Sequence, residues 1–505
     1  MPDAAARRWI AARGRWVQAG LAAVLGAVAA LGQAPWELWP LTVFAFGGVY
    51  GIYSASSGWR GAAIIGLAAG TGYFGVALSW IVEPFLIDMA QHGWMAPFAL
   101  LFSAVGFALF WAGAQGIAGK LGGGALTWAA LLTLSEALRG WLWTGFPWAQ
   151  PGHVLISTPM LAWASVGGAL PLTFAVLIAG AALWHLALGR RRAGATMVVL
   201  AGFYAAAPFL NRAPAPGKDA PIVRLVQPNV PQAQKWDPAY MQDHFDRQME
   251  FTQAGVPPDL IVWPETAVPA LLEHAGDLLD AIAGAARGAP IVLGVQRSEG
   301  ARYFNSLIVL DGQGNRTALY DKHHLVPFGE YVPFGDLLSR FGIRGLAQQA
   351  GYGYSPGPGA QVIEMGPLGA ALPLICYEGV FPRDVAAAPG RPDFLLLITN
   401  DAWFGQISGP YQHLAQARLR SAEQGLPMIR AANTGVSAMI DAAGHITAEI
   451  PLGQAGYLDA PLPPPLAPTL YARSGDWPCL LLLALMALLP AALHRQRNRQ
   501  AHVGL

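Results

Sequence analysis

One cysteine in this 505-residue chain stands where a nucleophile would be exposed to substrate. Cys376 directly follows Ala370–Ile375, a run of strand-forming residues, and the polar residues Tyr377 and Glu378 come next. A thiol at the end of a strand is accessible, and its thiolate can attack an acyl carbon. The other cysteine, Cys479, begins an apolar segment, so we expect no disulfide and predict that Cys376 is a functional thiol.

Two charged residues upstream can complete acyl-transfer chemistry. Glu265 follows the apolar run 260–264, and Lys322 lies in the polar stretch 320–324. Glu265 can take the thiol proton as general base, while Lys322 and a main-chain N–H near Cys376 can stabilise the thiolate and then the oxyanion. Each residue alone also fits an ordinary role as a buried cysteine, a solvated carboxylate or a surface lysine. All three in this order and context favour a catalytic set.

The order Glu265, Lys322, Cys376 resembles the catalytic triad of the nitrilase superfamily. Apolar segments on both sides of this region narrow the resemblance to the apolipoprotein N-acyltransferase family, and it covers almost the whole chain. The motifs that carry it are RGWLWTGFPW at 139–148, VQPNVPQ at 226–232, KW at 235–236, WPET at 263–266, YFNS at 303–306, DKHHLVPFGEYVPF at 321–334, CYE at 376–378 and TNDAWFG at 399–405.

The resemblance implies a role for each matching residue. Glu265, Lys322 and Cys376 match the triad, and Glu330 matches a second glutamate that supports the lysine or the reaction intermediate. The other matches are the pair after the nucleophile, Tyr377 and Glu378, and two pocket positions, Asn305 and Trp236. Three have structural alternatives: Glu330 as a rim carboxylate, Glu378 as a partner of Lys322, and Trp236 as a core aromatic residue.

We expect neither a metal nor another cofactor. His323 and His324 are adjacent on an extended segment, so their side chains point to opposite faces. No cluster of Cys, His or Asp residues with metal-ligand spacing accompanies them. Chemistry by glutamate, lysine and cysteine needs no metal.

The region 212–475 differs in composition from its flanks and reads as one α/β domain between Pro-rich linkers. Predicted strands alternate with predicted helices, and Asp311-Gly312 and Ala443-Gly444 mark hairpin turns. The resemblance implies a four-layer αββα sandwich with the catalytic residues at strand ends. The predicted strands are 222–227, 260–264, 291–295, 306–310, 371–376, 394–400, 428–432 and 437–440; the predicted helices are 238–253, 278–286 and 410–424.

The stretch 342–359 is rich in Gly, Tyr and Pro and is predicted to be a mobile loop. Together with Phe328, Tyr331 and Phe334 it would form either a lid that dips toward lipid or an ordinary surface loop.

The flanks are predicted to form a membrane-spanning helical bundle. The chain is 54% hydrophobic and 12% charged, whereas soluble domains have roughly 25% charged residues. Segment 125–146 contains Glu136 and Arg139, so a buried or re-entrant segment is the alternative there; these two residues either pair on one helix or position lipid headgroups. The eight apolar segments are 16–35, 38–55, 61–82, 95–118, 125–146, 160–188, 194–210 and 478–493, which places seven spans in 1–211 and one in 476–505.

Basic residues predict the orientation of these spans. Arginines before the first segment, Arg60, Lys120, the run 190–192 and the tail after 493 all fall on one side if there are eight spans. By the positive-inside rule both termini are cytoplasmic, and the 212–475 domain lies outside the cytoplasm. No basic run in that domain suggests nucleic acid.

The resemblance implies an enzyme of the bacterial inner membrane with its catalytic domain on the periplasmic side. It would transfer an acyl chain from a phospholipid, through a thioester at Cys376, to the α-amino group of a diacylglyceryl-modified apolipoprotein. Two alternatives stay open: a membrane-tethered amidase or nitrilase, which the triad fits equally, and a non-enzymatic transporter or receptor with a degenerate domain. A covalent acyl group on the purified protein would separate the first from the other two.

Overall fold

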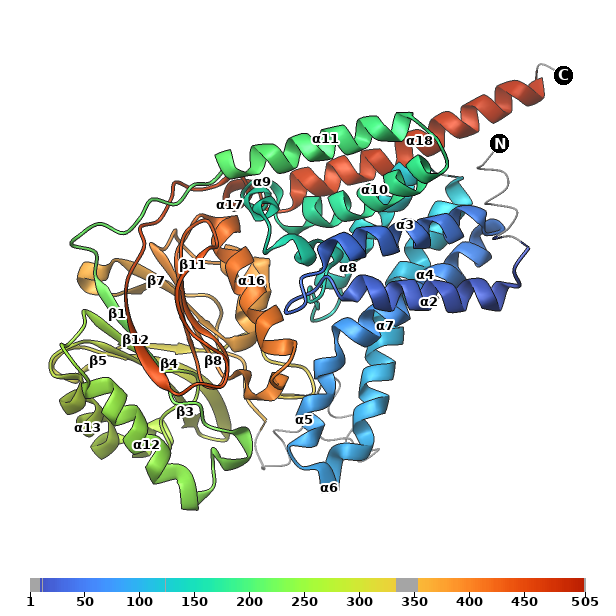
Figure 1. Cartoon of the computed structure of the whole chain (residues 1–505). Helices are drawn as coiled ribbons and strands as arrows, with labels where there is room; N and C mark the ends of the chain where they lie inside the picture. Colours follow the sequence, from blue (N-terminus) through green and yellow to red (C-terminus); the bar gives the residue numbers. More distant parts are fainter. Residues whose placement is uncertain (1–9, 11, 123, 333–352, 504–505) are drawn as a thin grey trace. The chain divides into compact units, whose positions relative to one another are not determined.

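The chain folds into two compact units. The computed structural model describes residues 10, 12–122, 124–332 and 353–503 (Figure 1). One unit comprises Met1–Asn211 together with Thr469–Leu505, and the other comprises Arg212–Pro468. The last two residues of the motif at 321–334, including Phe334, and most of the predicted loop 342–359 lie outside the described residues.

Two six-stranded sheets form the centre of the second unit. The strand order is β12-β1-β2-β3-β4-β5 in one sheet and β11-β10-β9-β8-β7-β6 in the other. Within each sheet three consecutive strands are parallel, β1 to β3 and β7 to β9. The strands are β1 Ile222–Gln227, β2 Leu260–Val262, β3 Ile291–Glu299, β4 Arg302–Leu310, β5 Arg316–Asp321, β6 Ile363–Glu364, β7 Ala370–Ile375, β8 Phe394–Thr399, β9 Met428–Ala432, β10 Ser437–Ile440, β11 Ile446–Ile450 and β12 Gly456–Pro461.

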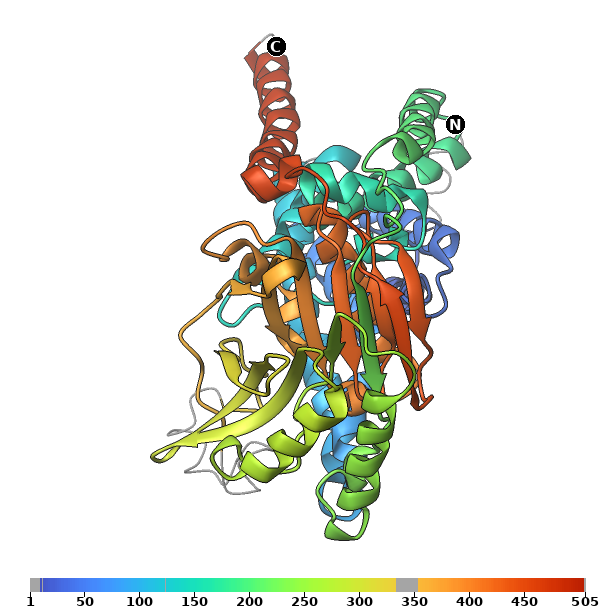
Figure 2. The ribbon, with the colours of Figure 1, turned by 90° about the vertical axis from the view of Figure 1, so that its left-hand side faces the viewer.

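Helices cover the outer face of each sheet, which gives the expected αββα order of layers. Helices α12 (Pro238–Gln253) and α13 (Gly276–Ala286) pack on the first sheet through Phe245 and Ile282. Helices α15 (Pro382–Ala386) and α16 (Gly409–Gln424) pack on the second through Val385 and Leu414. Figure 1 shows α12 and α13 on one side of the strands and α16 on the other, and Figure 2 views the unit from the side of α12 and α13.

Each predicted apolar segment of the first unit contains one long helix, and some also contain a short one. Three helical stretches of the described chain are long and apolar enough to cross a membrane, Met89–Leu121, Ala169–Ala187 and Arg192–Phe209, and Gly58–Ala77 with Ser79–Leu86 makes a fourth if this pair, bent by 63°, counts as one span. The unit is therefore a bundle of apolar helices, and the number of crossings stays a prediction. The helices are α2 Arg15–Ala30, α3 Trp39–Ala55, α4 Gly58–Ala77, α7 Ala96–Leu121, α8 Ala125–Trp141, α10 Ala169–Ala187, α11 Arg192–Ala206 and α18 Trp477–Val503.

Small residues let the helices of this bundle approach closely. A side-chain carbon added to Gly26 of α2 would lie 1.9 Å from the carbonyl oxygen of Ala69 in α4. Such contacts between small residues are typical of helix packing in membranes, where van der Waals contact replaces the hydrophobic effect.

Glu136 and Arg139 pair within α8, the first of the two predicted arrangements. The Arg139 Nη2 to Glu136 Oε2 distance is 2.5 Å, and both side chains are buried. Trp111 of α7 donates to Glu136 Oε1 at 2.7 Å, and Arg139 also donates to the carbonyl oxygen of Phe146. These bonds connect α7, α8 and the segment after α8, and they use the charges for helix packing.

Candidate active site

The three residues of the predicted triad lie at the ends of strands from both sheets. Glu265 follows β2 and Lys322 follows β5, both in the first sheet, while Cys376 follows β7 in the second. Strands β2, β3 and β5 run in the same direction, so Glu265 and Lys322 lie at the same end of the sheet, beyond the C-terminal ends of β2 and β5. Glu265 Oε1 and Lys322 Nζ lie 3.6 Å apart, and both residues are close enough to Cys376 for their charges to shift the pKa of its thiol.

Glu265 is held by donors from both sheets. Its Oε1 accepts a hydrogen bond from Asn305 Nδ2 of β4 at 2.6 Å, and its Oε2 accepts one from the main-chain N–H of Asn400, after β8, at 2.8 Å. The Lys322 Nζ lies 3.6 Å from Oε1. The carboxylate is thus fixed beside Lys322, and Asn305 orients it directly.

Lys322 is a buried ammonium group between two carboxylates. Its Nζ donates to Glu330 Oε1 at 2.9 Å, and the side chain is 1% exposed. Burial alone would lower the pKa of Lys322, but the charges of Glu330 and Glu265 outweigh burial and raise this pKa well above its ordinary value. Lys322 therefore stays charged at neutral pH and cannot act as the base.

Glu330 also fixes its own loop. Its Oε2 accepts from the main-chain N–H of Val326 at 2.8 Å, and its main-chain oxygen accepts from the N–H of Tyr354 at 3.0 Å. The described end of the predicted mobile loop is thus packed on the domain, because Gly357 in turn donates to the carbonyl of Lys322 at 2.9 Å.

Cys376 occupies a strained position directly after β7. Its φ is +52°, in the left-handed region that non-glycine residues rarely adopt. Burial raises the pKa of its thiol well above the ordinary value, the nearby Glu265 charge adds to this, and Lys322 opposes it. The resting group is a thiol, so a base must remove its proton during attack.

A buried chain of polar contacts, from Arg430 through Asp401 to His413, reaches the carbonyl oxygen of Cys376. His413 of α16 places Nε2 3.2 Å from the Cys376 carbonyl oxygen and Nδ1 2.8 Å from Asp401 Oδ1. Arg430 of β9 donates to Asp401 Oδ2 at 2.7 Å. Burial would raise the pKa of Asp401, but the charges of Arg430 and His413 hold it well below its usual value.

Glu378 ties the nucleophile's turn to the segment after Lys322. The carboxylate is fully buried and accepts from the main-chain N–H groups of Ile375 and His323, both at 2.7 Å, and from Tyr320 Oη at 2.9 Å. These bonds, rather than the alternative ion pair with Lys322, explain its burial. Glu378 thereby fixes Cys376 and Lys322 relative to each other through the main chain.

Tyr377 and Trp236 occupy different surroundings. Tyr377 is buried and packs edge-on against His324 and Phe381, with ring centroids 5.4 and 4.8 Å away. Trp236 is 43% exposed, so the alternative of a core aromatic residue is wrong. The Lys235 Nζ lies 5.7 Å from the centre of the Trp236 ring.

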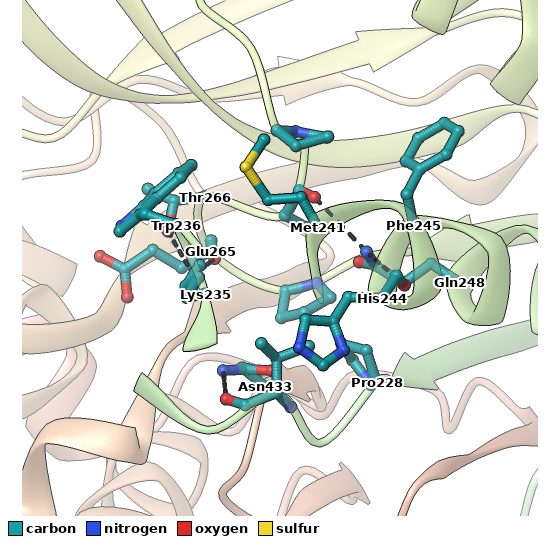
Figure 3. Close-up of a pocket in the computed structure, with 14 residues that line it drawn as sticks. Pro228, Lys235, Trp236, Met241, His244, Phe245, Gln248, Glu265, Thr266 and Asn433 are labelled. Atoms are coloured by element: carbon teal, nitrogen blue, oxygen red, sulfur yellow. Dashed lines mark hydrogen bonds between the residues drawn. The ribbon is translucent and has the colours of Figure 1, made fainter. Parts of the chain in front are cut away.

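A small cavity is lined in part by Glu265 and Thr266 (Figure 3). Its volume is about 30 Å³, enough for one or two water molecules. Lys235, Trp236 and His244 line it. His244 is buried, and within the described residues neither of its ring nitrogens has a hydrogen-bond partner.

Several contacts of the site were not predicted. The sequence motifs include Asn400, Asp401 and Lys235, but the motifs alone assigned none of them a role. His413 and Arg430 lie outside every motif. Their contacts join segments that are far apart in the chain, such as Glu265 and Asn400 at a separation of 135 residues, and only the packing of the two sheets reveals them.

A thiol at a strained strand end, facing a carboxylate and a buried ammonium group across an αββα sandwich, defines a cysteine-containing domain of the nitrilase type. Residues 222–468 match the carbon-nitrogen hydrolase family model, and residues 25–182 match the model of the apolipoprotein N-acyltransferase N-terminal domain.

Relatives cover nearly the whole chain. The apolipoprotein N-acyltransferase of Rhodopseudomonas palustris is 36% identical over 94% of this chain and 95% of its own length, and that of Brucella melitensis is 37% identical with the same coverage. Among solved structures, an amidase from Nesterenkonia sp. AN1 is 19% identical, covers 51% of this chain and 97% of its own, and has a TM-score of 0.37. The chain belongs to the apolipoprotein N-acyltransferase family, which confirms the resemblance found in the sequence.

Proposed function

We propose that this chain transfers a fatty acyl chain from a phospholipid to the α-amino group of the diacylglyceryl-cysteine at the N-terminus of apolipoproteins. The observation that carries the proposal is the meeting of Cys376, Glu265 and Lys322 at one edge of the sandwich, in a chain whose relatives bear this name. The two-step reaction needs one nucleophile, one base and one fixed positive charge, and we assign these roles to Cys376, Glu265 and Lys322.

In the first half-reaction the Cys376 sulfur attacks the ester carbonyl carbon while Glu265 takes the thiol proton. Lys322 faces the oxyanion as charge develops. The ester C–O bond then breaks, and protonated Glu265 returns its proton to the departing lysophospholipid oxygen. The thioester on Cys376 is the product of this step.

In the second half-reaction the acceptor amine attacks the thioester carbonyl carbon. Glu265, again a carboxylate, takes a proton from the amine, the C–S bond breaks, and the proton passes to the Cys376 sulfur. The amide product leaves and the resting thiol is restored. A raised thiol pKa favours this last transfer, because the sulfur readily takes the proton back.

Measurement of intact mass after incubation with phospholipid alone tests the first half-reaction. We expect the purified chain to gain the mass of one acyl group and Cys376→Ser to gain none. An unchanged mass, with free fatty acid accumulating instead, would indicate the membrane-tethered hydrolase and sink the transferase.

We further propose eight membrane crossings with both termini in the cytoplasm, seven crossings in 1–211, one in 476–505, and the 212–475 domain on the periplasmic side of the inner membrane. Helical segments at all eight predicted positions and the distribution of basic residues support this arrangement.

Accessibility labelling tests the orientation. In a background without native cysteines, Val256→Cys probes an exposed loop of the α/β unit and Ser57→Cys probes the exposed turn between α3 and α4. A membrane-impermeant thiol reagent, added after the outer envelope is permeabilised, should label the first and spare the second. The opposite pattern would contradict both the orientation and the acceptor, because exported lipoproteins present their amino termini at the outer leaflet.

A further inference from the structure

Lys235 brings a second ammonium group to the Glu265–Thr266 turn that follows β2. Its Nζ donates to the main-chain oxygen of Glu265 at 3.0 Å and to Thr266 Oγ1 at 2.6 Å (Figure 3). The side chain arises from the segment between β1 and α12, so it reaches Glu265 from a different direction than Lys322 does. One donor thus grips two consecutive residues, the first of which is the proposed base.

The turn that Lys235 grips is strained and closely packed. Thr266 has a φ of +46°, which a β-branched residue rarely adopts. On the other side of the turn, a side-chain carbon at Gly294 of β3 would lie 2.6 Å from Glu265 Cα, so only glycine allows β3 to approach. The carbonyl of Gly294 accepts from the N–H of Ala267 at 2.8 Å. Strand β3 therefore holds the end of the turn, and Lys235 holds its beginning.

The charge of Lys235 belongs to the electrostatics of the site. Burial lowers the pKa of Lys235 to about 8, although the charges of Glu265 and Cys376 act in the opposite direction. The ionisable groups around it are Glu265 after β2, Cys376 after β7 and His244 of α12. Burial also lowers the pKa of His244, so this imidazole is neutral at neutral pH, where Lys235 is charged.

We propose that Lys235 is a positioning residue for acyl transfer, whose ammonium group fixes the Glu265–Thr266 turn and thereby aims the carboxylate of Glu265 at the thiol of Cys376. This inference rests on the proposed role of Glu265 as base. It assigns to Lys235 a task that differs from that of Lys322, because Lys235 contacts the main chain of the base and Lys322 contacts its carboxylate.

Single-turnover thioester formation in the full-length protein tests this role. Lys235→Met keeps the length of the side chain but removes the donor, and we expect the rate to fall about 10- to 100-fold, as for other small misplacements of a reacting group. The phospholipid concentration at half-saturation should stay unchanged. Lys235→Arg should recover most of the rate, and Thr266→Val, which removes one of the two acceptors with little change in shape, should lose less than Lys235→Met.

The pH dependence separates positioning from simple stabilisation. Above about pH 8 the wild-type lysine loses its charge, so the wild-type rate should decline there relative to Lys235→Arg, whose guanidinium group stays charged. Lys218→Met, at an exposed lysine of the same unit, is the matched control and should behave as wild type. A purely structural lysine would lower the melting midpoint without changing this profile.

The outcomes distinguish the inference from the proposed function. If the wild type forms the thioester and Lys235→Met does so at the same rate and with the same pH profile, the role of Lys235 is overturned and the proposed transferase function stands. If the wild type forms no thioester, the proposed function fails, and iodoacetamide alkylation of Cys376 in a Cys479→Ala background decides the role of Lys235. If Lys235→Met leaves the pH profile of this alkylation unchanged, the inference about Lys235 is overturned in that case too.

Discussion

Buried charges occur in both units of the chain, but they are arranged in different ways. In the helical unit Arg139 and Glu136 bond to each other, and Trp111 and the Phe146 carbonyl take up further bonding positions. Rings of Phe74 and Phe107 cover the guanidinium group at 4.9 and 5.5 Å. Every part of this pair is committed to holding helices together.

In the α/β unit one group of buried charges instead surrounds Cys376, a residue that carries no full charge at rest. Lys322 lies between Glu265 and Glu330, and both Lys322 and Glu265 act on the thiol of Cys376. The supporting groups, Asn305, the Asn400 N–H and Lys235, fix the Glu265 side of the site. Both units thus contain buried, paired charges. The α/β unit differs because the charges of Glu265 and Lys322 surround a reactive atom, the sulfur of Cys376.

The largest effect should come from replacing Cys376, the thiol of the α/β unit, whereas replacing Cys479, the thiol of the helical unit, should have no effect. Cys376→Ser changes one atom, yet an alkoxide is far harder to form near neutral pH than a thiolate, so the thioester-forming rate should fall by about 10⁴-fold or more. The α18 thiol is the matched control, and Cys479→Ser should keep the wild-type rate. Single-turnover mass measurements check both, and an active Cys376→Ser would assign the nucleophile elsewhere.

The next effect compares the buried carboxylates, beginning with Glu265→Gln. An amide nitrogen in place of either oxygen would face a donor, Asn305 Nδ2 or the Asn400 N–H, and it cannot accept the thiol proton. We expect thioester formation to slow by about 10²- to 10⁴-fold, the usual contribution of a general base. Rapid-quench measurement of the acyl-enzyme checks this, and acyl-enzyme formation at the normal rate would remove Glu265 from the role of base.

The counterpart in the helical unit is Glu136→Gln. It leaves Arg139 buried without its anionic partner, and such a change costs about 3 kcal/mol in the free energy of unfolding. The rate constant of the folded fraction should remain that of the wild type. A slower reaction with an unchanged melting midpoint in detergent would instead show that the pair acts on substrate.

The sequence was most informative where strands are fully buried. The ranges of β1, β9 and β10 agree with those predicted, because mostly apolar runs mark strands covered on both faces, although β1 and β9 also contain the buried Arg224 and Arg430. The four strands without a predicted range, β5, β6, β11 and β12, are the edges of the two sheets. Their residues alternate or are partly exposed, as in β11 and β12, so no apolar run announces them.

A similar limit applies to the site. Motifs located Glu265, Lys322 and Cys376. Glu265 and Cys376 follow buried strands, whereas Lys322 follows the partly exposed edge strand β5 and was recognised from its motif. The groups that orient them come from segments far away in the chain, and Asn400 contributes a main-chain N–H whose chemistry no side chain reveals. Lys235 was visible as part of a motif, but its function depends on the strained Thr266 turn, which only the backbone geometry exposes.

The smallest predicted effect concerns the pair formed by His323 and Glu378, whose Nδ1 and Oε1 atoms are 2.7 Å apart. Burial opposes the charge on both residues, but their mutual interaction raises the pKa of His323 above its ordinary value of 6.5 and lowers that of Glu378 below 4.5. The histidine's stabilisation is therefore complete below pH 6.5 and is lost as pH rises through the raised pKa, whereas that of Glu378 is complete above pH 4.5 and is lost as pH falls through the lowered pKa.

His323→Gln should remove the decline in stability above pH 6.5, a difference below about 1 kcal/mol because the imidazole is partly exposed. Melting midpoints between pH 5 and pH 9 measure this difference. The control is His445→Gln, at a more exposed histidine that pairs with Asp441, and it is expected to change less. If His445→Gln shifts the profile as much as His323→Gln, burial is not what gives these charges their effect, and the contrast between paired and directed charge would need another basis.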